Sequence, residues 1–401
     1  MAVFLAFGYV ASAQQTSASA NQAEINQQLL QRIQELEKEV QVLKAQPAPQ
    51  AVSAPSPAAP KPLPVVEATT MNEVAPRLKL NIFGDLGYQV GHYYVPNNTF
   101  EIGEFDLFAT ARLSPQVSVL GEILFTPNDD NNVGIDIERL LIKYRQSDYF
   151  AASIGRIHTD LGYYNTAFNR GDYFQTAIGR PAMFEFDDQG GFLPLQDLGI
   201  VFEGKVPSGK LGLNYVFELT DGRAYGAGVQ PAQNSSDGNN SKAVNVNISA
   251  KPDWVPGLDV GFSIRHDYLT DPFNLRVSET IPIVYAVFTN SKYEWLNEAM
   301  FVTHSLPGGQ SFHTPGFYTQ LSRAFGPYRP YFRYSYVNAP ANDPIYGNPG
   351  EMPIVGRING PTVGMRYDFT PYTAFKLQYD REDQVGFKPT NGGSGQFAFT
   401  F

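Results

Sequence analysis

The chain ends on the stretch Gln396-Phe397-Ala398-Phe399-Thr400-Phe401, in which aromatic side chains alternate with small or polar ones up to the last residue. A period of two gives an extended strand one apolar face and one polar face. In a water-soluble protein, an exposed strand of this kind promotes aggregation. In a closed transmembrane barrel, the same strand is paired on both sides and its aromatic face lies against lipid. The stretch therefore predicts the wall of a β-barrel.

The composition of the chain agrees with a barrel. Its 401 residues exceed what one compact soluble core usually holds, and no linker divides the chain after residue 70. Outside the N-terminus no apolar run reaches the length of a membrane-spanning helix, which excludes a helical membrane protein. The absence of cysteine excludes disulfides, thiol catalysis and thiolate metal ligands. The net charge of -10 argues against a nucleic-acid partner.

From Leu78 to Phe401 the sequence alternates in segments of strand length, and short connections follow every other segment. An even number of strands with short turns at one rim and longer loops at the other is typical of outer-membrane barrels. We therefore predict an all-β fold, a sixteen-stranded antiparallel transmembrane β-barrel. The predicted strands lie near residues 78–90, 104–113, 117–126, 136–145, 149–157, 198–205, 210–219, 243–251, 257–268, 281–289, 293–304, 314–324, 329–338, 357–369, 373–380 and 395–401.

Two local patterns qualify this prediction. Aromatic residues gather at the short turns, where rings with polar edges favour the membrane interface; they are Tyr144, Tyr149, Trp254, Tyr293, Trp295, Phe325, Tyr328, Phe369 and Tyr372. The tenth, eleventh and twelfth segments alternate poorly, because Leu296 and Met300 share a face with Glu294 and Glu298.

The N-terminal part of the chain contains three further segments. Residues 1–13 resemble a secretory signal peptide that lacks its basic start, because no Lys or Arg precedes Arg32. Residues 22–45 carry a heptad pattern typical of a short α-helical coiled coil of two or three strands. Its predicted core is Asn26, Ile33 and Val40 at the a positions and Leu29, Leu36 and Leu43 at the d positions. Residues 46–77, rich in Pro and Ala, predict an extended linker before a barrel over 78–401.

The longest connection, about residues 158–197, follows the fifth predicted strand, and so long a loop in a compact fold is usually functional. Sixteen strands, a long third outer loop and a terminal Phe401 resemble the trimeric outer-membrane porins of Gram-negative bacteria. The coiled coil is more similar to the phosphate-selective (porin O/P) and dicarboxylate-type porins, which carry a periplasmic coiled coil. This resemblance implies a homotrimer in the outer membrane, with its N-terminal region in the periplasm and its third loop folded into the lumen.

Charged residues on this loop and on the inward face of the strands are the candidates for a pore constriction, since opposed charges across a narrow lumen orient dipolar solutes. On the loop they are Glu185, Asp187, Asp188, Arg170 and Arg180. On the wall, strand parity gives Arg112, Arg139, Lys143, Arg156, Arg265, Arg333, Arg366 and Lys376.

The predicted function is passive diffusion of small hydrophilic solutes or ions across the outer membrane, with outer-membrane lipids and further copies of the chain as partners. Acidic residues also fall on the inward face, so the lumen is mixed in charge and the sequence leaves a phosphate, anion or sugar specificity open. A structural tether between the outer membrane and the cell wall is the alternative from another class. The five histidines are scattered and no H-E-x-x-H or G-x-S-x-G motif occurs, so we expect no enzyme, no metal and no cofactor.

Overall fold

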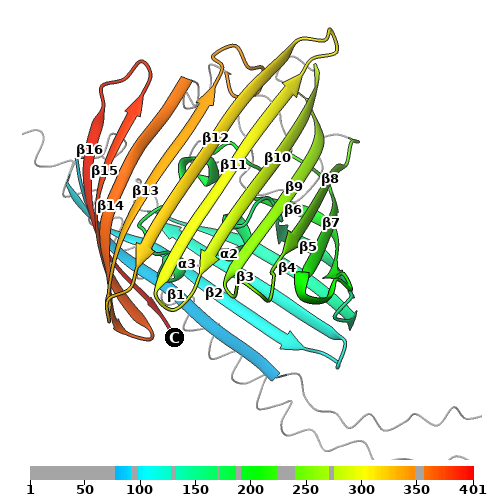
Figure 1. The fold of residues 1–401 in the computed structure, drawn as a ribbon, viewed down its shortest axis with the longest axis horizontal. Coiled ribbons are helices and arrows are strands. Elements are labelled where there is room, and N and C mark those ends of the chain that lie inside the picture. The colour runs from blue at the N-terminus through cyan, green and yellow to red at the C-terminus, as the bar shows by residue number, and fades with distance from the viewer. Residues whose placement is uncertain are drawn as a thin grey trace, which may run out of the picture. The chain divides into compact units, whose positions relative to one another are not determined.

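The structure is a computed structural model that describes residues 77–91, 98–127, 132–168, 171–186, 191–223, 240–270, 275–347 and 356–401. Sixteen strands follow one another along the chain, and each pairs antiparallel with its neighbours until β16 meets β1 and closes the barrel (Figure 1). The strands are β1 Arg77–Val90, β2 Thr99–Arg112, β3 Val117–Pro127, β4 Val133–Ser147, β5 Phe150–His158, β6 Gln196–Lys205, β7 Leu213–Thr220, β8 Ala243–Ala250, β9 Leu258–Thr270, β10 Arg276–Thr289, β11 Tyr293–Ser305, β12 Ser311–Arg323, β13 Tyr328–Ala339, β14 Gly356–Thr370, β15 Thr373–Gln384 and β16 Thr390–Thr400.

The predicted all-β, closed, sixteen-stranded antiparallel barrel is confirmed, and every predicted strand has a counterpart. The bounds differ most at the ends away from the short turns: β2 begins at Thr99, β10 at Arg276 and β12 at Ser311, each earlier than expected. The signal peptide, the coiled coil with its six core residues, and all of the linker except Arg77 lie outside the described residues. Among the described residues, no helix is long and apolar enough to cross a membrane.

The barrel closes through the stretch that predicted it. Phe83 of β1 pairs with Thr400 of β16, and beyond this pair Ile82 and Phe401 exchange two backbone hydrogen bonds of 2.8 and 3.0 Å. Phe397 is 51% exposed and Phe401 70% exposed, whereas Ala398 between them is buried. The aromatic face of the last strand therefore points outward, as the alternation predicts.

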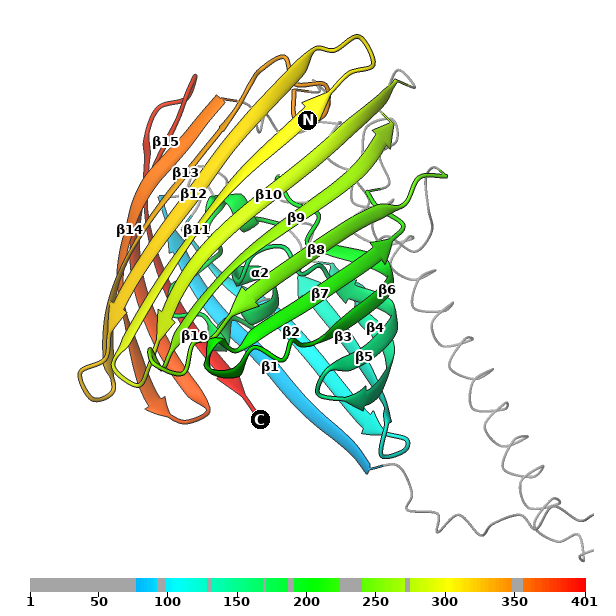
Figure 2. The ribbon, with the colours of Figure 1, turned by 45° about the vertical axis from the view of Figure 1, so that its right-hand side comes forward.

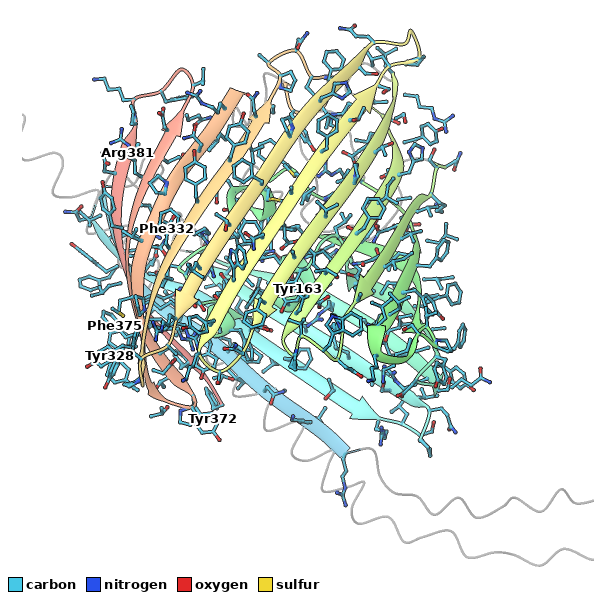
Figure 3. All side chains as sticks on the ribbon, viewed as in Figure 1. Tyr163, Tyr328, Phe332, Tyr372, Phe375 and Arg381 are labelled. Atoms are coloured by element: carbon cyan, nitrogen blue, oxygen red, sulfur yellow. The ribbon has the colours of Figure 1, made fainter. Side chains whose placement is uncertain are left out.

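Each strand of the wall has a large apolar outer face and a buried or polar inner face. The nine aromatic residues at the short turns are all exposed. In Figure 3, Tyr328 and Tyr372 lie near the turn end of the barrel, Phe332 lies higher on the wall, and Arg381 lies toward the loop end. The outer surface thus has an aromatic band at the turn end and apolar residues above it, as a lipid-facing wall requires.

The weak alternation of β10 to β12 has a physical cause in the interior. Ile281, Ile283, Leu296, Met300 and Val302 all lie on the inner face and are fully or almost fully buried. They join one apolar core with residues of the connection between β5 and β6. Because this part of the inner wall is covered by chain, it carries apolar side chains where an open channel would carry polar ones.

Substitutions at two neighbouring leucines of β4 test which face of the wall contacts lipid. Leu140 is 58% exposed on the outer face near the middle of the strand, and Leu141 follows it on the inner face. A charge facing lipid at mid-depth costs about 2–4 kcal/mol. We expect Leu140→Arg to lower the free energy of unfolding in phospholipid vesicles by about this amount and Leu141→Arg by less than about 1 kcal/mol. Denaturant titration followed by the fluorescence of Trp254 and Trp295 measures both, and equal losses would contradict the assigned faces.

Candidate functional site

The connection between β5 and β6, residues 159–195, is the third long loop and contains the short helices α2 Tyr164–Ala167 and α3 Gly171–Phe174 and the 3-10 turn η1 Ala182–Phe184. Its two ends are held together: the Thr159 amide donates to the carbonyl of Leu195 (3.0 Å), and the Asn165 side chain donates to the carbonyls of Thr159 (2.9 Å) and Leu195 (2.8 Å). In both Figure 1 and Figure 2, α2 lies within the outline of the barrel. The loop therefore leaves and rejoins the wall at adjacent positions, which are joined by hydrogen bonds.

The first half of the loop is held by a carboxylate on β11. Glu298 is 2% exposed and accepts hydrogen bonds from the Tyr163 amide (2.6 Å), the Tyr164 amide (2.9 Å) and the Tyr318 hydroxyl (2.7 Å). Gly162 precedes these amides with a φ of 70°, and a Cβ there would lie 2.2 Å from the Glu298 carboxylate. A glycine is therefore needed for the loop to approach the wall this closely.

The middle of the loop, residues 173–179, is held by cations on β13 to β15. Arg366 donates to the carbonyls of Tyr173 and Gln175, Lys376 to the carbonyl of Ala177, and Arg333 to the carbonyls of Ile178 and Gly179. Five carbonyl oxygens from one stretch of backbone thus accept from three wall cations that are each at most 8% exposed. Hydrogen bonds to charged groups contribute about 1.5–3 kcal/mol, more than neutral ones. We call these three residues the cation clamp.

Strand register brings two cations of the clamp, Arg366 and Lys376, into one row. Arg329, Arg366 and Lys376 are direct cross-strand partners on β13, β14 and β15, and Gln396 on β16 follows in the same row. Like charges in such a row repel one another unless an acceptor compensates them. The carbonyl oxygens of the loop supply that compensation for Arg366 and Lys376, so the loop and the row stabilise each other.

Aromatic packing holds the loop between these two anchors. The rings of Tyr164, Phe184 and Tyr318 pack with centroid separations of 5.5 to 6.1 Å, and all three residues are buried. At the far end of the loop, Phe174 packs against Phe83 of β1 at 5.2 Å, and the Tyr173 hydroxyl donates to the Pro371 carbonyl in a short turn (2.6 Å). The described loop therefore contacts strands on both sides of the closure.

Four of the five other predicted wall cations have carboxylate or amide partners. Arg139 pairs with Glu122, and Arg265, which is fully buried, pairs with Asp197. Lys143 donates to Glu203 (2.9 Å), and Arg156 donates to the Gln196 side chain and to the Glu138 carbonyl. Arg112 is exposed at the turn end of β2. These pairs give the interior a mixed charge.

The predicted loop residues are only partly described. Arg180 is buried within the loop, where its side chain donates to the Phe184 carbonyl and its guanidinium lies 4.3 Å from the centroid of the Phe186 ring. Glu185 is partly exposed just after η1. Arg170, Asp187 and Asp188 lie outside the described residues. The described loop therefore presents one predicted carboxylate and one predicted cation, and that cation stabilises the loop itself.

Several interior residues escaped the sequence analysis. His304 on β11 lies between Glu279 (2.9 Å) and Asp343 of the connection after β13 (2.8 Å), and all three are almost fully buried. Asp160, at the start of the third loop, accepts from the Asn247 side chain (2.8 Å), and burial raises the pKa of its carboxyl to about 7. Only the pairing of β10 with β11 and the course of two loops bring these groups together, so no local pattern could reveal them. The described residues contain no group of three or more His, Cys, Asp or Glu that could hold a metal ion.

Comparison with known proteins finds similar folds among solved structures and no match by sequence. No protein-family model and no curated protein matches the chain. An anion-selective porin from Comamonas acidovorans matches 82% of this chain and 100% of its own, with a TM-score of 0.57 and 12% identity. The outer-membrane channel DcaP of Acinetobacter baumannii matches 82% and 98%, with a TM-score of 0.53 and 11% identity. The trimer form of OmpT, an outer-membrane protein of Vibrio cholerae, matches 81% and 99%, with a TM-score of 0.53 and 10% identity.

The chain has the fold of the outer-membrane porins. At these identities the likeness concerns the fold alone, and the porin fold is confirmed over the barrel strands.

The cation clamp can be tested against a neighbour in its own row. Arg366→Gln removes donors to two loop carbonyls, whereas Arg329→Gln changes a direct cross-strand partner that donates to Ser322. We expect Arg366→Gln to destabilise the docked loop by about 1.5–3 kcal/mol, because the loop loses charged hydrogen bonds. Hydrogen–deuterium exchange of the amides of residues 173–179 should then quicken by at least about tenfold, and Arg329→Gln should leave it nearly unchanged. Equal protection in both variants would refute the clamp.

Proposed function

We propose that the protein is an outer-membrane porin that allows small hydrophilic solutes or ions to diffuse passively through its barrel. The observation that carries the proposal is the combination of a closed sixteen-stranded wall, an apolar outer face and an inner face with many charged side chains. A barrel of this size encloses more space than wall side chains alone fill, and 16-stranded porins leave an aqueous channel.

The proposed constriction lies where the third loop faces the wall. The Glu298 anchor, the cation clamp and the Phe174–Phe83 contact support a loop that crosses the barrel interior. We assign Glu185, Asp187, Asp188 and Arg170 to the side of the loop that faces solute, while Arg180 stiffens the loop. Among the wall cations, we assign Arg112 and Lys143 to the lining, because they are the more exposed ones. Arg333, Arg366 and Lys376 bind the loop, and Arg139, Arg156 and Arg265 are buried beside their partners.

We propose that the turn end of the barrel faces the periplasm and the loop end faces the outside of the cell. Short turns on one rim and long loops on the other are typical of this orientation. The N-terminal signal peptide, coiled coil and linker then belong to the periplasmic side, where β1 begins at Arg77.

Conductance of the purified protein in planar lipid bilayers tests the pore. We expect stepwise, ohmic openings, because a fixed aqueous channel conducts in proportion to voltage. Silent but correctly inserted barrels would instead favour the tether between outer membrane and cell wall. Neutralising Glu185, Asp187 and Asp188 together should shift the reversal potential in a tenfold KCl gradient toward anions, and this shift should shrink between about 0.1 and 1 M salt as the Debye length falls to about 3 Å. A reversal potential that is the same in the wild type and the triple variant would show that other residues determine the selectivity.

We propose further that the chain assembles as a homotrimer, supported by the fold shared with a trimer form of another outer-membrane protein. The coiled coil offers only a few heptads, whereas packing of barrel walls can bury a far larger area. Deleting residues 22–45 should therefore weaken or slow trimer formation and still leave trimers on a native gel. Monomers alone after the deletion would show that the coil, and not the barrel, holds the subunits together.

A further inference from the structure

The inner wall formed by β1 to β4 carries its charges in four rows, and strand register defines each row. The row nearest the turn end contains three cations and no carboxylate. Its direct cross-strand partners are Arg77, Arg112, Ser118 and Lys143. Arg77 and Arg112 are exposed, and Lys143 is partly buried beside Glu203.

The next row toward the loop end holds one cation and is otherwise neutral. It consists of Lys79, Thr110, Leu120 and Leu141. Lys79 is exposed and the two leucines are partly exposed on the inner face.

The third and fourth rows reverse the sign. They consist of Asn81, Phe108, Glu122 and Arg139, followed by Phe83, Asp106, Leu124 and Asp136. Arg139 pairs with Glu122, and Asp106 and Asp136 are the other two carboxylates of these rows. Together these rows hold one cation, Arg139, and three carboxylates, Glu122, Asp106 and Asp136.

Carboxylates continue toward the loop end on the same strands. Asp85 follows Phe83 on the inner face of β1 and accepts hydrogen bonds from the Glu104 amide (2.9 Å) and the Gln396 side chain (3.0 Å). Glu101 lies opposite Gly87 on β2 and accepts from the Gln89 side chain. The sign of the charge along this wall therefore changes from positive at the turn end to negative at the loop end.

This charged wall lies across the barrel from the strands that hold the first half of the third loop. In the closed strand order, β3 and β4 are eight positions from β11 and β12, which carry Glu298 and Tyr318. The loop reaches one part of this wall, because Phe174 packs against Phe83 of β1. Arg77, Lys79 and Arg112 remain exposed, and Glu101 and Asp136 remain partly exposed. These exposed side chains act on passing ions more than those covered by the loop.

We infer that the rows on β1 to β4 form an axial charge ladder that makes the pore electrically asymmetric, with anions concentrated at its turn-end mouth and cations at its loop-end mouth. This inference rests on the proposed pore function and adds a direction to it. A fixed charge attracts counter-ions within about a Debye length, roughly 10 Å at 0.1 M salt. The two mouths therefore offer different ions to the same channel.

The asymmetry has a defined polarity. When the loop-end chamber is positive, cations enter from the mouth that concentrates cations and anions enter from the mouth that concentrates anions, so the channel fills with both. When the loop-end chamber is negative, each mouth receives the ion it repels and the channel is depleted. We expect the current at 0.1 M KCl to be larger with the loop end positive, by a factor of about 1.5 to 2, and the ratio to approach 1 at 1 M.

The measurement needs channels of known orientation, and the absence of cysteine in the chain makes this direct. Ser118 lies on the inner face in the row nearest the turn end, so Ser118→Cys places one thiol at that mouth. A bulky maleimide too wide for the constriction should reduce the current only when it is added to the chamber that contacts the turn end. The chamber from which the maleimide reduces the current shows which way each channel is inserted. The current–voltage curve recorded before the addition can then be read with a known orientation.

Two pairs of substitutions separate the ladder from overall charge. Arg77→Gln/Arg112→Gln removes two cations of the first row, and Lys210→Gln/Lys292→Gln removes two exposed cations from turns at the same end. We expect the first pair to bring the current ratio close to 1 and the second to leave it as in the wild type. Glu101→Gln/Asp136→Asn removes two carboxylates toward the loop end, and it should also lower the current ratio.

Each outcome decides a different point. Wild-type channels that conduct equally at both polarities in 0.1 M KCl would overturn the ladder and leave the porin function intact. An equal fall of the ratio in the first-row pair and the turn pair would assign the asymmetry to net charge and also overturn the ladder. Channels that insert and carry no current would overturn the pore itself, and the inference with it.

Discussion

A wall in contact with lipid must satisfy its own backbone hydrogen bonds, because no water is present to do so. In this chain that constraint falls on the seam between β1 and β16, where residues more than three hundred positions apart have to pair. The seam holds through pairs such as Phe83 with Thr400 and through the two hydrogen bonds between Ile82 and Phe401. Pairing of the last strand with the first closes the ring, so that every strand has a partner on both sides.

Closure of the barrel creates an interior, and apolar or charged side chains that face this interior need partners. The part of the wall from β10 to β12 carries apolar residues inward, which would be unfavourable against water. The third loop covers them with Tyr164 and Phe184 and is held there by Glu298 and the cation clamp. Buried charges need partners as well, and here the partners are backbone amides and carbonyls of the loop. Loop and wall are thus parts of one packed core.

The strands were predictable because their signal is local. Alternation over about ten residues indicates a strand and its outward face, and each of the sixteen predicted strands has a counterpart in the structure. The contacts of the third loop were not predictable, because they join side chains to backbone carbonyls more than 150 positions away. Irregular positions also defeat parity: Gly155 has a φ of 141°, and the residue after it, Arg156, is buried beside Glu138. Arg333, Arg366 and Lys376 were identified as inward-facing cations, but sequence alone could not distinguish a lining residue from one that holds a loop.

The two sides of the barrel thus differ in what their inner faces do, and the difference is visible in the alternation itself. On β10 and β11 much of the inner face is apolar, so hydrophobicity no longer separates the two faces and the pattern is weaker. On β1, β2 and β4 most inner positions are polar or charged, among them Arg77, Lys79, Arg112 and Asp136, against an apolar exterior, and the pattern is clearer. A strand whose two faces are both apolar indicates chain on its inner side, and a strand with sharp contrast indicates water there. The quality of the alternation along a barrel sequence therefore carries information about which part of the wall a loop covers, before any contact of that loop is known.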